Sequence, residues 1–280
     1  VRAMAAVGRF GDAAALLDAG PLSEPDDKPP MELLKLRFGL ASAQRDAKGE
    51  IATAKRVLKA WPKAPDGTDL LSSGLLRSGR YRAAIELLHD LSRKHPERDI
   101  VLGRIAGMVA FLRGAAGDNP KLAEDLAAVE KRMSDAAKDD NDIVARFLDA
   151  TRKYYAGELA ASLPELEALT KTDNRDPRIP LYLAMAHFWL GHQGQAKRLI
   201  ERAVEIGPSD PDVFYCRSQI LRKESLPRAI TDLERYVEMT NRPWALNPDK
   251  KDARVKAELD YMKRGLLPPD WDRPGKERVP

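Results

Sequence analysis

Histidine and aspartate are the residues of this sequence whose types could hold a metal ion. A metal site on a helix uses two histidines four residues apart, because that spacing places both imidazoles on one helix face. The four histidines are His89, His95, His187 and His192, and no two of them have that spacing. We therefore expect no metal ion and no cofactor, and we interpret His187 as a packing or turn residue.

Three aspartates at positions 139, 140 and 142 are similar to the acidic start of a calcium-binding loop. Such a loop also requires a central glycine and a closing glutamate, and both are missing here. The pattern therefore favours a solvated loop. Gly114, Gly117, Gly191 and Gly194 follow helical patterns and not strands, so a dinucleotide-binding or phosphate-binding loop is excluded.

Cys216 is the only cysteine, so no intrachain disulfide can form. The helix that we expect around it carries no histidine or lysine at a spacing that would stabilise a thiolate. A neutral thiol is the favoured interpretation. With no nucleophile, base or metal site in the sequence, we predict no catalytic residue and no enzyme activity.

The composition indicates a helical protein with a well-solvated surface. Apolar residues make up 43% of the 280 residues and charged residues 32%, while aromatic residues contribute only 6%. Such a composition favours helix over strand. The 47 basic and 43 acidic residues form no sustained basic stripe, so we expect no nucleic-acid partner.

The sequence contains no apolar run long enough to cross a membrane, and no signal peptide, so we expect no direct membrane insertion. We expect a cytoplasmic protein. The sequence begins at Val1 in the middle of a helical pattern, so a removed signal or lipoprotein anchor stays open as the alternative.

A helical apolar pattern organises residues 177–208. One apolar stripe ends at a break over residues 191–194, and a second stripe ends at Gly207 and Pro208. In the second stripe Ala196, Ile200 and Ala203 are four and three residues apart, which places them on one helix face. This pattern predicts two short antiparallel helices. Neither can bury its apolar stripe alone, so we expect further copies stacked on this pair.

A second copy of the pattern occupies residues 79–96. Counted from Gly79, an alanine, two leucines and a proline follow at the offsets 5, 9, 12 and 17, and the same offsets from Gly191 reach Ala196, Ile200, Ala203 and Pro208. A small residue at the turn, then alanine and large apolar residues, then a closing proline resemble the tetratricopeptide repeat family, whose unit has about 34 residues. The resemblance covers most of the chain and implies an all-α fold, a right-handed superhelical solenoid of about six to seven antiparallel helix pairs.

The expected helices follow this repeat. An opening half-unit turns at residues 8–10, and helix pairs are then expected at 31–47 and 50–60, 68–78 and 81–95, 99–113 and 121–137, 141–156 and 159–172, within 177–208 on either side of the break at 191–194, and at 211–223 and 227–239. We expect the pair 31–47 and 50–60 to turn at Lys48 and Gly49, with its second helix about one turn short. We expect the pair 99–113 and 121–137 to have an extended turn that ends at Asn119 and Pro120. The expected domains are the repeat array, residues 1–248, a capping helix, 249–265, and a tail rich in proline and charge, 266–280.

The resemblance also implies a binding face. In the family, five positions of each first helix line the concave surface, and here they place several apolar and aromatic side chains together. The partner-binding groove that we expect contains Phe111, Phe147, Tyr154, Tyr155, Arg178, Leu181, Met185, Phe188, Trp189, Tyr215 and Arg222. The alternative for the apolar members is that they fill gaps between neighbouring helices.

The function implied by the resemblance is a non-enzymatic scaffold or adaptor that binds a peptide or helix of a partner protein in the concave groove. The alternative is a structural or self-assembling module of a larger complex, including a homo-oligomer. The asparagines lie in expected turns or at helix ends, so we do not expect the carboxylate clamp of the family. Whether the tail around Trp271 occupies the groove as an internal ligand stays open.

Overall fold

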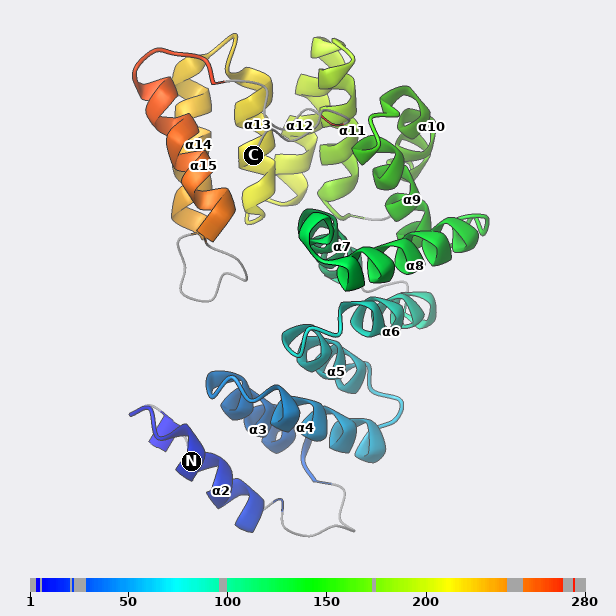
Figure 1. Cartoon of the computed structure of the whole chain (residues 1–280), viewed down its shortest axis with the longest axis vertical. Coiled ribbons are helices and arrows are strands. Elements are labelled where there is room, and N and C mark those ends of the chain that lie inside the picture. The colour runs from blue at the N-terminus through cyan, green and yellow to red at the C-terminus, as the bar shows by residue number, and fades with distance from the viewer. Residues whose placement is uncertain are drawn as a thin grey trace. The chain divides into compact units, whose positions relative to one another are not determined.

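The computed structural model describes residues 4–5, 7–20, 22, 29–95, 100–172, 175–240, 249–268 and 274. These residues form fourteen α-helices and one short 3-10 helix, and no strand occurs among them (Figure 1). The predicted all-α fold is confirmed. Loop residues 241–248 and most of the expected tail lie outside the described residues.

The chain forms two compact units, Val1–Arg132 and Met133–Pro280. The helices of the first unit are α2 (Phe10–Ala19), α3 (Met31–Ala43), α4 (Ala47–Ala60), α5 (Asp66–Arg77), α6 (Tyr81–Lys94), α7 (Ile100–Ala115), η1 (Ala116–Asp118) and most of α8 (Pro120–Ala136). Those of the second unit are α9 (Ile143–Tyr155), α10 (Leu159–Leu169), α11 (Arg178–Trp189), α12 (Gln193–Ile206), α13 (Pro211–Leu221), α14 (Leu226–Thr240) and α15 (Asp249–Lys263). The single array expected over residues 1–248 stays a prediction.

Within each unit, helices that follow one another along the chain pack together in a series. In the second unit this series runs from α9 to α15, and the first helices of successive pairs also touch, since α11 contacts both α9 and α13 (Figure 1). In the first unit the series runs from α2 to α7. This stacking of helix pairs on their neighbours is the α-solenoid arrangement that the repeat pattern predicted.

The turns inside the helix pairs recur with the predicted period. Gly157 and Gly191 both have positive φ angles, 84° each, and they lie one repeat unit apart in the sequence. Gly79, at φ 74°, is matched one repeat unit earlier by Arg45, at φ 56°. A left-handed residue is favourable for glycine and costly for other residues, so Arg45 carries strain that the other turns avoid.

The expected turn at Lys48 and Gly49 is therefore wrong. The turn lies over residues 44–46, and α4 is a full helix of 14 residues that begins at Ala47. A carboxylate oxygen of Asp46 accepts a hydrogen bond from the backbone N–H of Gly49 at 2.9 Å, which caps this helix. The turn was predicted at a glycine, Gly49, whereas the residue with the left-handed backbone conformation is Arg45.

Three aspartates lie at the starts of first helices in the second unit. Asp142, Asp176 and Asp210 follow one another at intervals of one repeat unit. Each accepts a backbone N–H hydrogen bond at the start of its helix, at 3.0, 2.9 and 3.0 Å respectively. Asp142 and Asp210 are the N-cap residues of α9 and α13, and such a cap contributes about 1 kcal/mol, whereas Asp176 lies one residue before the N-cap of α11. The three aspartates supply a second repeat signal besides the turn glycines.

The core positions of the second helices agree with the prediction. The three side chains at four-and-three spacing are buried in α6 (Ala84, Leu88, Leu91), α10 (Ser162, Leu166, Leu169), α12 (Ala196, Ile200, Ala203) and α14 (Ala229, Leu233, Tyr236). The equivalent set in α4 is Glu50, Ala54 and Val57, and it is fully buried too. A glutamate thus stands where the other second helices have a small side chain.

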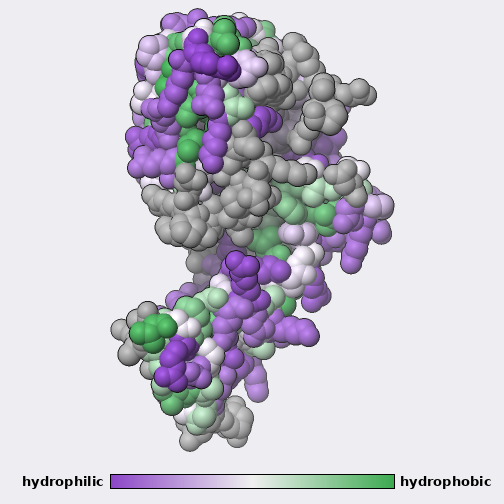
Figure 2. All heavy atoms as spheres, turned by 60° about the vertical axis from the view of Figure 1, so that its left-hand side comes forward, coloured by the Kyte–Doolittle hydropathy of each residue, from purple (hydrophilic) through white to green (hydrophobic). Residues whose placement is uncertain are grey.

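The predicted start of α8 is confirmed. Pro120 is its first residue, and the side-chain oxygen of Asn119 accepts hydrogen bonds from the N–H groups of Lys121 and Leu122 at 3.1 and 3.3 Å. A proline is favourable there because its missing N–H would have no helical partner. α15 occupies the residues of the expected capping helix, and its capping role stays a prediction. Among the coloured residues of the face in Figure 2, hydrophilic ones predominate, with hydrophobic patches between them.

Candidate functional site

Four aromatic side chains of α9 and α11 form a cluster, which we call the aromatic cluster: Tyr154, Tyr155, Tyr182 and Trp189. The three tyrosine rings meet edge to face, with centroid distances of 5.3 to 5.9 Å. The hydroxyls of Tyr155 and Tyr182 are hydrogen-bonded at 2.7 Å, and Nε1 of Trp189 donates to the hydroxyl of Tyr154 at 3.1 Å. The cluster is therefore held by both ring contacts and hydrogen bonds.

The repeat explains why these residues meet. Tyr155 and Trp189 each precede a turn glycine by two residues, so they occupy equivalent positions in successive repeat units. Because α9 and α11 pack side by side, equivalent positions become neighbours. Tyr182 lies two helical turns before Trp189 on the same face of α11, which brings its ring against those of α9.

The cluster is partly accessible. Tyr154 is buried, whereas Tyr155, Tyr182 and Trp189 are half-buried. Burial raises the pKa of Tyr182 well above its ordinary value of 10.0, and the nearby Tyr155 adds to the shift. The hydroxyl of Tyr182 therefore stays protonated at neutral pH, and the exposed part of the cluster is uncharged.

Arg178 is tied into the protein beside the cluster. Its guanidinium lies 3.4 Å from Asp176 and 3.1 Å from Asp210, which joins the start of α11 to the start of α13. Burial would lower the pKa of Arg178, but Asp210 and Asp176 outweigh it and the pKa is raised. Burial raises the pKa of Asp210, and Arg178 opposes that shift. Arg178 is half-buried and its charge is paired with these two aspartates, while its expected role in the groove stays a prediction.

Most of the expected groove residues are buried. These are Phe147, Tyr154, Leu181, Met185, Phe188, Tyr215 and Arg222. We expected them on an exposed concave surface, and the structure differs because successive first helices pack on one another: α9 and α13 both contact α11. We expected these seven side chains to be exposed, and they are buried instead. They fill space between neighbouring helices, as the alternative described.

Three other expected groove residues remain at least partly exposed. Tyr155 and Trp189 belong to the aromatic cluster. Phe111 belongs to α7 of the first unit, where its ring lies 4.8 Å from that of Tyr81. The structure therefore brings Tyr155 and Trp189 together, and it gives Phe111 a different neighbour. A binding role for each of them stays a prediction.

The capping helix covers the expected groove residue of α13. The hydroxyl of Tyr215 donates to one carboxylate oxygen of Glu258 at 3.2 Å, and the amide of Gln219 donates to the other at 2.8 Å. Glu258 is buried, and Arg254 also donates to the hydroxyl of Tyr215 at 3.1 Å. We expected a capping helix over these residues, but the repeat pattern gave no signal for this polar interface.

Tyr182 was missed as well. The family positions used for the expected groove omit it, yet its ring contacts Phe147, Tyr154 and Tyr155. A helical pattern could have found it, because residues 178, 182, 185 and 189 are spaced by four, three and four along one face of α11.

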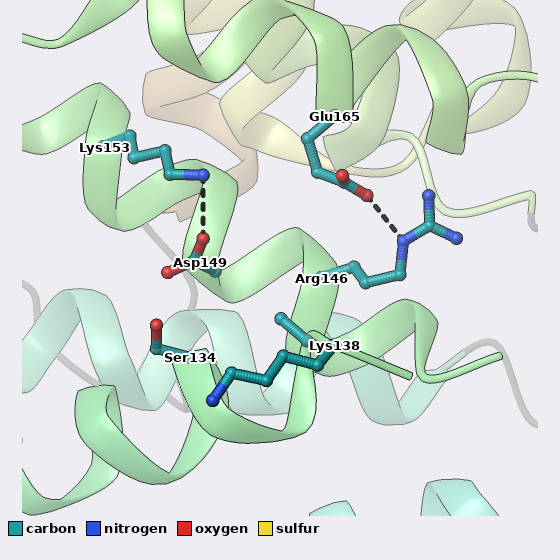
Figure 3. A pocket seen from close by; sticks show the side chains of 7 residues that line it. Ser134, Lys138, Arg146, Asp149, Lys153 and Glu165 are labelled. Carbon is teal, nitrogen blue, oxygen red and sulfur yellow. Dashed lines mark hydrogen bonds and ion pairs between the residues drawn. The ribbon is translucent and has the colours of Figure 1, made fainter. Parts of the chain in front are cut away.

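A hollow of about 190 Å³ lies between the end of α8, α9 and α10 (Figure 3). Its lining is polar: Ser134, Ala137, Lys138, Arg146, Asp149, Lys153 and Glu165. Arg146 is 2.6 Å from Glu165, and Lys153 is 3.0 Å from Asp149. Burial opposes ionisation of Asp149, but the hydrogen bonds from Lys153 and Arg152 prevail and lower its pKa. Each carboxylate that lines this hollow is thus paired with a basic side chain.

Two histidines meet at the turn between α11 and α12. The Nδ1 atoms of His187 and His192 are 3.1 Å apart, and Nε2 of His187 lies 3.9 Å from Glu167. Burial lowers the pKa of His187, His192 lowers it further, and Glu167 opposes both. His187 is buried in the last turn of α11, and its role as a packing or turn residue stays an interpretation. In the part of the chain that the structure describes, no three metal-binding side chains gather, and no helix has the length and apolarity to span a membrane.

The chain matches known proteins in structure but not in sequence. No family model matches the sequence, and no curated protein matches it either. The chain is similar to the crystal structure of a tetratricopeptide repeat protein from Parabacteroides merdae, with 16% identity, a TM-score of 0.52, and coverage of 94% of this chain and 95% of the other. A thermophilic TPR protein from Thermus thermophilus shows 14% identity, a TM-score of 0.43, and coverage of 82% and 97%.

The Parabacteroides structure carries the fold assignment, since it spans nearly the whole of both chains. The stacked helix pairs and the repeat period of about 34 residues described above fit this assignment. The chain therefore has the fold of the tetratricopeptide repeat proteins.

Proposed function

We propose that the second unit is a non-enzymatic interaction module that binds an extended segment of a partner protein on the aromatic cluster. The observation that carries this proposal is the half-buried trio Tyr155, Tyr182 and Trp189, supported from below by Tyr154. Large aromatic side chains dominate the binding energy of protein interfaces because they bury much area while losing few rotamers.

The rigidity of the cluster supports the proposal. Side chains that are ordered before binding lose less conformational entropy when a ligand arrives. Here the ring contacts and the two hydrogen bonds, at 2.7 and 3.1 Å, hold the side chains of α9 and α11 in one arrangement. A peptide that lies across the two helices would contact an already organised surface.

A peptide-library selection on the immobilised full chain tests this proposal. We expect one motif to be enriched on the wild-type protein and lost on the double variant Tyr155→Ala, Trp189→Ala. Tyr261→Ala is the matched control, because Tyr261 is an exposed aromatic residue of α15 outside the cluster. Circular dichroism and the melting temperature show whether each variant is folded. Equal retention of the motif by the double variant would overturn the proposal.

A second candidate function, self-assembly, is favoured by the surface around α2. Val7 is 72% exposed and Leu16 is 48% exposed, which is unusual for side chains beside a helix of an apolar array. Light scattering over a concentration series of the wild-type chain and of Leu16→Glu tests this candidate. A concentration-dependent mass that the substitution lowers supports self-assembly, and a constant monomer mass excludes it for this chain.

A further inference from the structure

The last fifteen residues have the composition of an extended ligand. Residues 266–280 contain four of the prolines of the chain, one tryptophan and two adjacent leucines. The proline ring fixes φ, so a segment rich in proline is extended before it binds and loses little entropy on docking. Aromatic surfaces built from tyrosine and tryptophan bind such segments in recognition domains.

The described residues of this segment are not uniformly exposed. Leu266 and Leu267, directly after α15, are 48% and 51% exposed. Pro268 is buried and Pro274 is half-buried. Among prolines at other helix boundaries, Pro120, Pro208 and Pro227 are exposed and Pro65, Pro177 and Pro211 are half-buried. Pro268, directly after α15, is therefore covered more completely than these six prolines.

The distance to the aromatic cluster can be spanned. α15 contacts α13 through the hydrogen bonds of Tyr215, and α13 packs against α11, which carries Tyr182 and Trp189 (Figure 1). Two steps between packed helices amount to about 20 Å. The six residues from Pro268 to Pro274 span about 19 Å in the polyproline conformation, at about 3.1 Å per residue. The segment is thus long enough to reach α11.

Acidic side chains lie next to the cluster, and the last part of the segment, after position 272, is basic. Asp176, Asp210 and Asp212 surround Arg178 at the starts of α11 and α13, so three carboxylates face one guanidinium. Asp212 also acts on the hydroxyl of Tyr182, which places this acidic group beside the cluster. Residues 269–280 carry equal numbers of acidic and basic residues, Asp270, Asp272 and Glu277 against Arg273, Lys276 and Arg278. The basic residues are concentrated in the last part of the segment, where Glu277 is the one acidic residue after position 272. Opposite charges of this kind set the orientation of a bound segment.

From the proline content of the segment, the burial of Pro268, the distance that the segment can span and its basic end, we infer that residues 269–280 dock on the aromatic cluster as an intramolecular ligand. The external ligand of the cluster is then an extended, proline-containing peptide with a basic flank. The inference rests on the proposed peptide-binding role of the cluster, and it adds the class of peptide and a competitor. A tethered competitor acts at an effective concentration of about a millimolar. An external peptide must displace it, so the tail lowers the apparent affinity of the cluster.

Photo-crosslinking on the full chain tests the docking. With the photoreactive residue p-benzoylphenylalanine in place of Trp271, irradiation should give an intramolecular crosslink to α9 or α11, mapped by mass spectrometry. The charge-reversed tail Arg273→Glu, Lys276→Glu, Arg278→Glu should reduce that crosslink at least fivefold. Crosslinks confined to other helices, or the absence of an intramolecular crosslink, would overturn the intramolecular docking.

Competition tests the ligand class. A fluorescent synthetic peptide of residues 266–280 should bind the full chain with the charge-reversed tail at least tenfold more tightly than it binds the wild-type chain, because the variant tail no longer competes. Adding Trp189→Ala to that variant should remove the gain, and adding Tyr261→Ala should preserve it. Equal affinity for the wild-type and tail-variant chains would refute the competitor.

The two proposals fail in different ways. If the library selection enriches a motif that depends on Tyr155 and Trp189 but contains no proline, and the tail crosslinks elsewhere, the cluster binds peptides and the tail inference is wrong. If neither the library nor the tail peptide depends on those two residues, the binding role of the cluster is wrong as well.

Discussion

Nε1 of Trp189 donates a hydrogen bond to the hydroxyl of Tyr154 over 3.1 Å, and so joins the last turns of α9 and α11. The two residues are 35 positions apart, one repeat plus one residue. Through this bond a part-exposed indole is fixed by a buried tyrosine. The accessible surface of the aromatic cluster thus depends on a residue that solvent does not reach.

Tyr154→Phe removes the acceptor of this bond and keeps the ring. We expect the free energy of unfolding to fall by about 1 kcal/mol, the usual net contribution of one hydrogen bond. In a cycle with Trp189→Phe, which removes the donor, the two effects should couple by about the same amount. Urea unfolding of the four proteins measures the coupling. Strictly additive effects would show that the bond contributes nothing.

Arg45→Gly should stabilise the first unit. A glycine adopts the left-handed conformation without strain, which raises the free energy of unfolding by about 1–2 kcal/mol. Glycine also has more conformational freedom in the unfolded chain, which offsets part of this increase, so we expect a net stabilisation of about 0.5–1 kcal/mol. Gly79→Ala, at the equivalent turn with φ 74°, should cost about 1 kcal/mol.

Gly107→Ala is the control for these two turn variants. Gly107 lies within α7, where a Cβ atom would meet no neighbour within 4 Å, so this substitution should stabilise by about 0.5–1 kcal/mol. The same exchange of glycine for alanine is thus expected to have opposite signs at positions 79 and 107. Chemical denaturation measures both, and equal signs would contradict the backbone explanation.

Arg77→Ala should strongly destabilise the first unit. Nε of Arg77 lies 2.7 and 2.8 Å from the two carboxylate oxygens of Glu50, whose side chain is completely buried. Removing the arginine leaves a buried carboxylate without its ion-pair partner, which costs about 3 kcal/mol. Equilibrium unfolding in urea provides the measurement.

The double variant Glu50→Ala, Arg77→Ala should recover most of that loss, because α6 and α12 have alanine at the position of Glu50. Arg9→Ala is the comparison for an exposed pair, since Arg9 and Asp12 are both solvated, and it should change stability by less than about 1 kcal/mol. A double variant as unstable as Arg77→Ala alone would rule out this account of the pair.

Acidification should destabilise the second unit through His187. The folded-state pKa of His187 is lowered by burial and by His192, against the opposition of Glu167. Between that lowered pKa and its ordinary value near 6.5, the unfolded state binds more protons, so stability falls as the pH is lowered through this window. His187→Gln should reduce this loss, measured as the difference in unfolding free energy between pH 7 and pH 5. An unchanged pH dependence would contradict it.

The helix pairs were predictable because their signals are local. A turn glycine followed by small and large apolar residues at offsets 5, 9 and 12 defines α6 and α12 from a window of about one helix, and the structure buries those residues as predicted. The start of α8 at Pro120 was equally local. The turn at Arg45 was not, since nothing in the neighbouring residues marks an arginine for a left-handed conformation.

The sequence by itself thus determined the helices, their pairing and the repeat period, because each depends on residues that lie within one repeat unit of one another. The accessible face was decided only by the tertiary structure. Whether Met185 or Tyr182 of α11 reaches solvent depends on how closely α9 and α13 approach that helix, and the structure buries the first and half-buries the second. Burial is a property of the packed neighbours, and so the binding surface emerged only when helices distant in sequence were placed together.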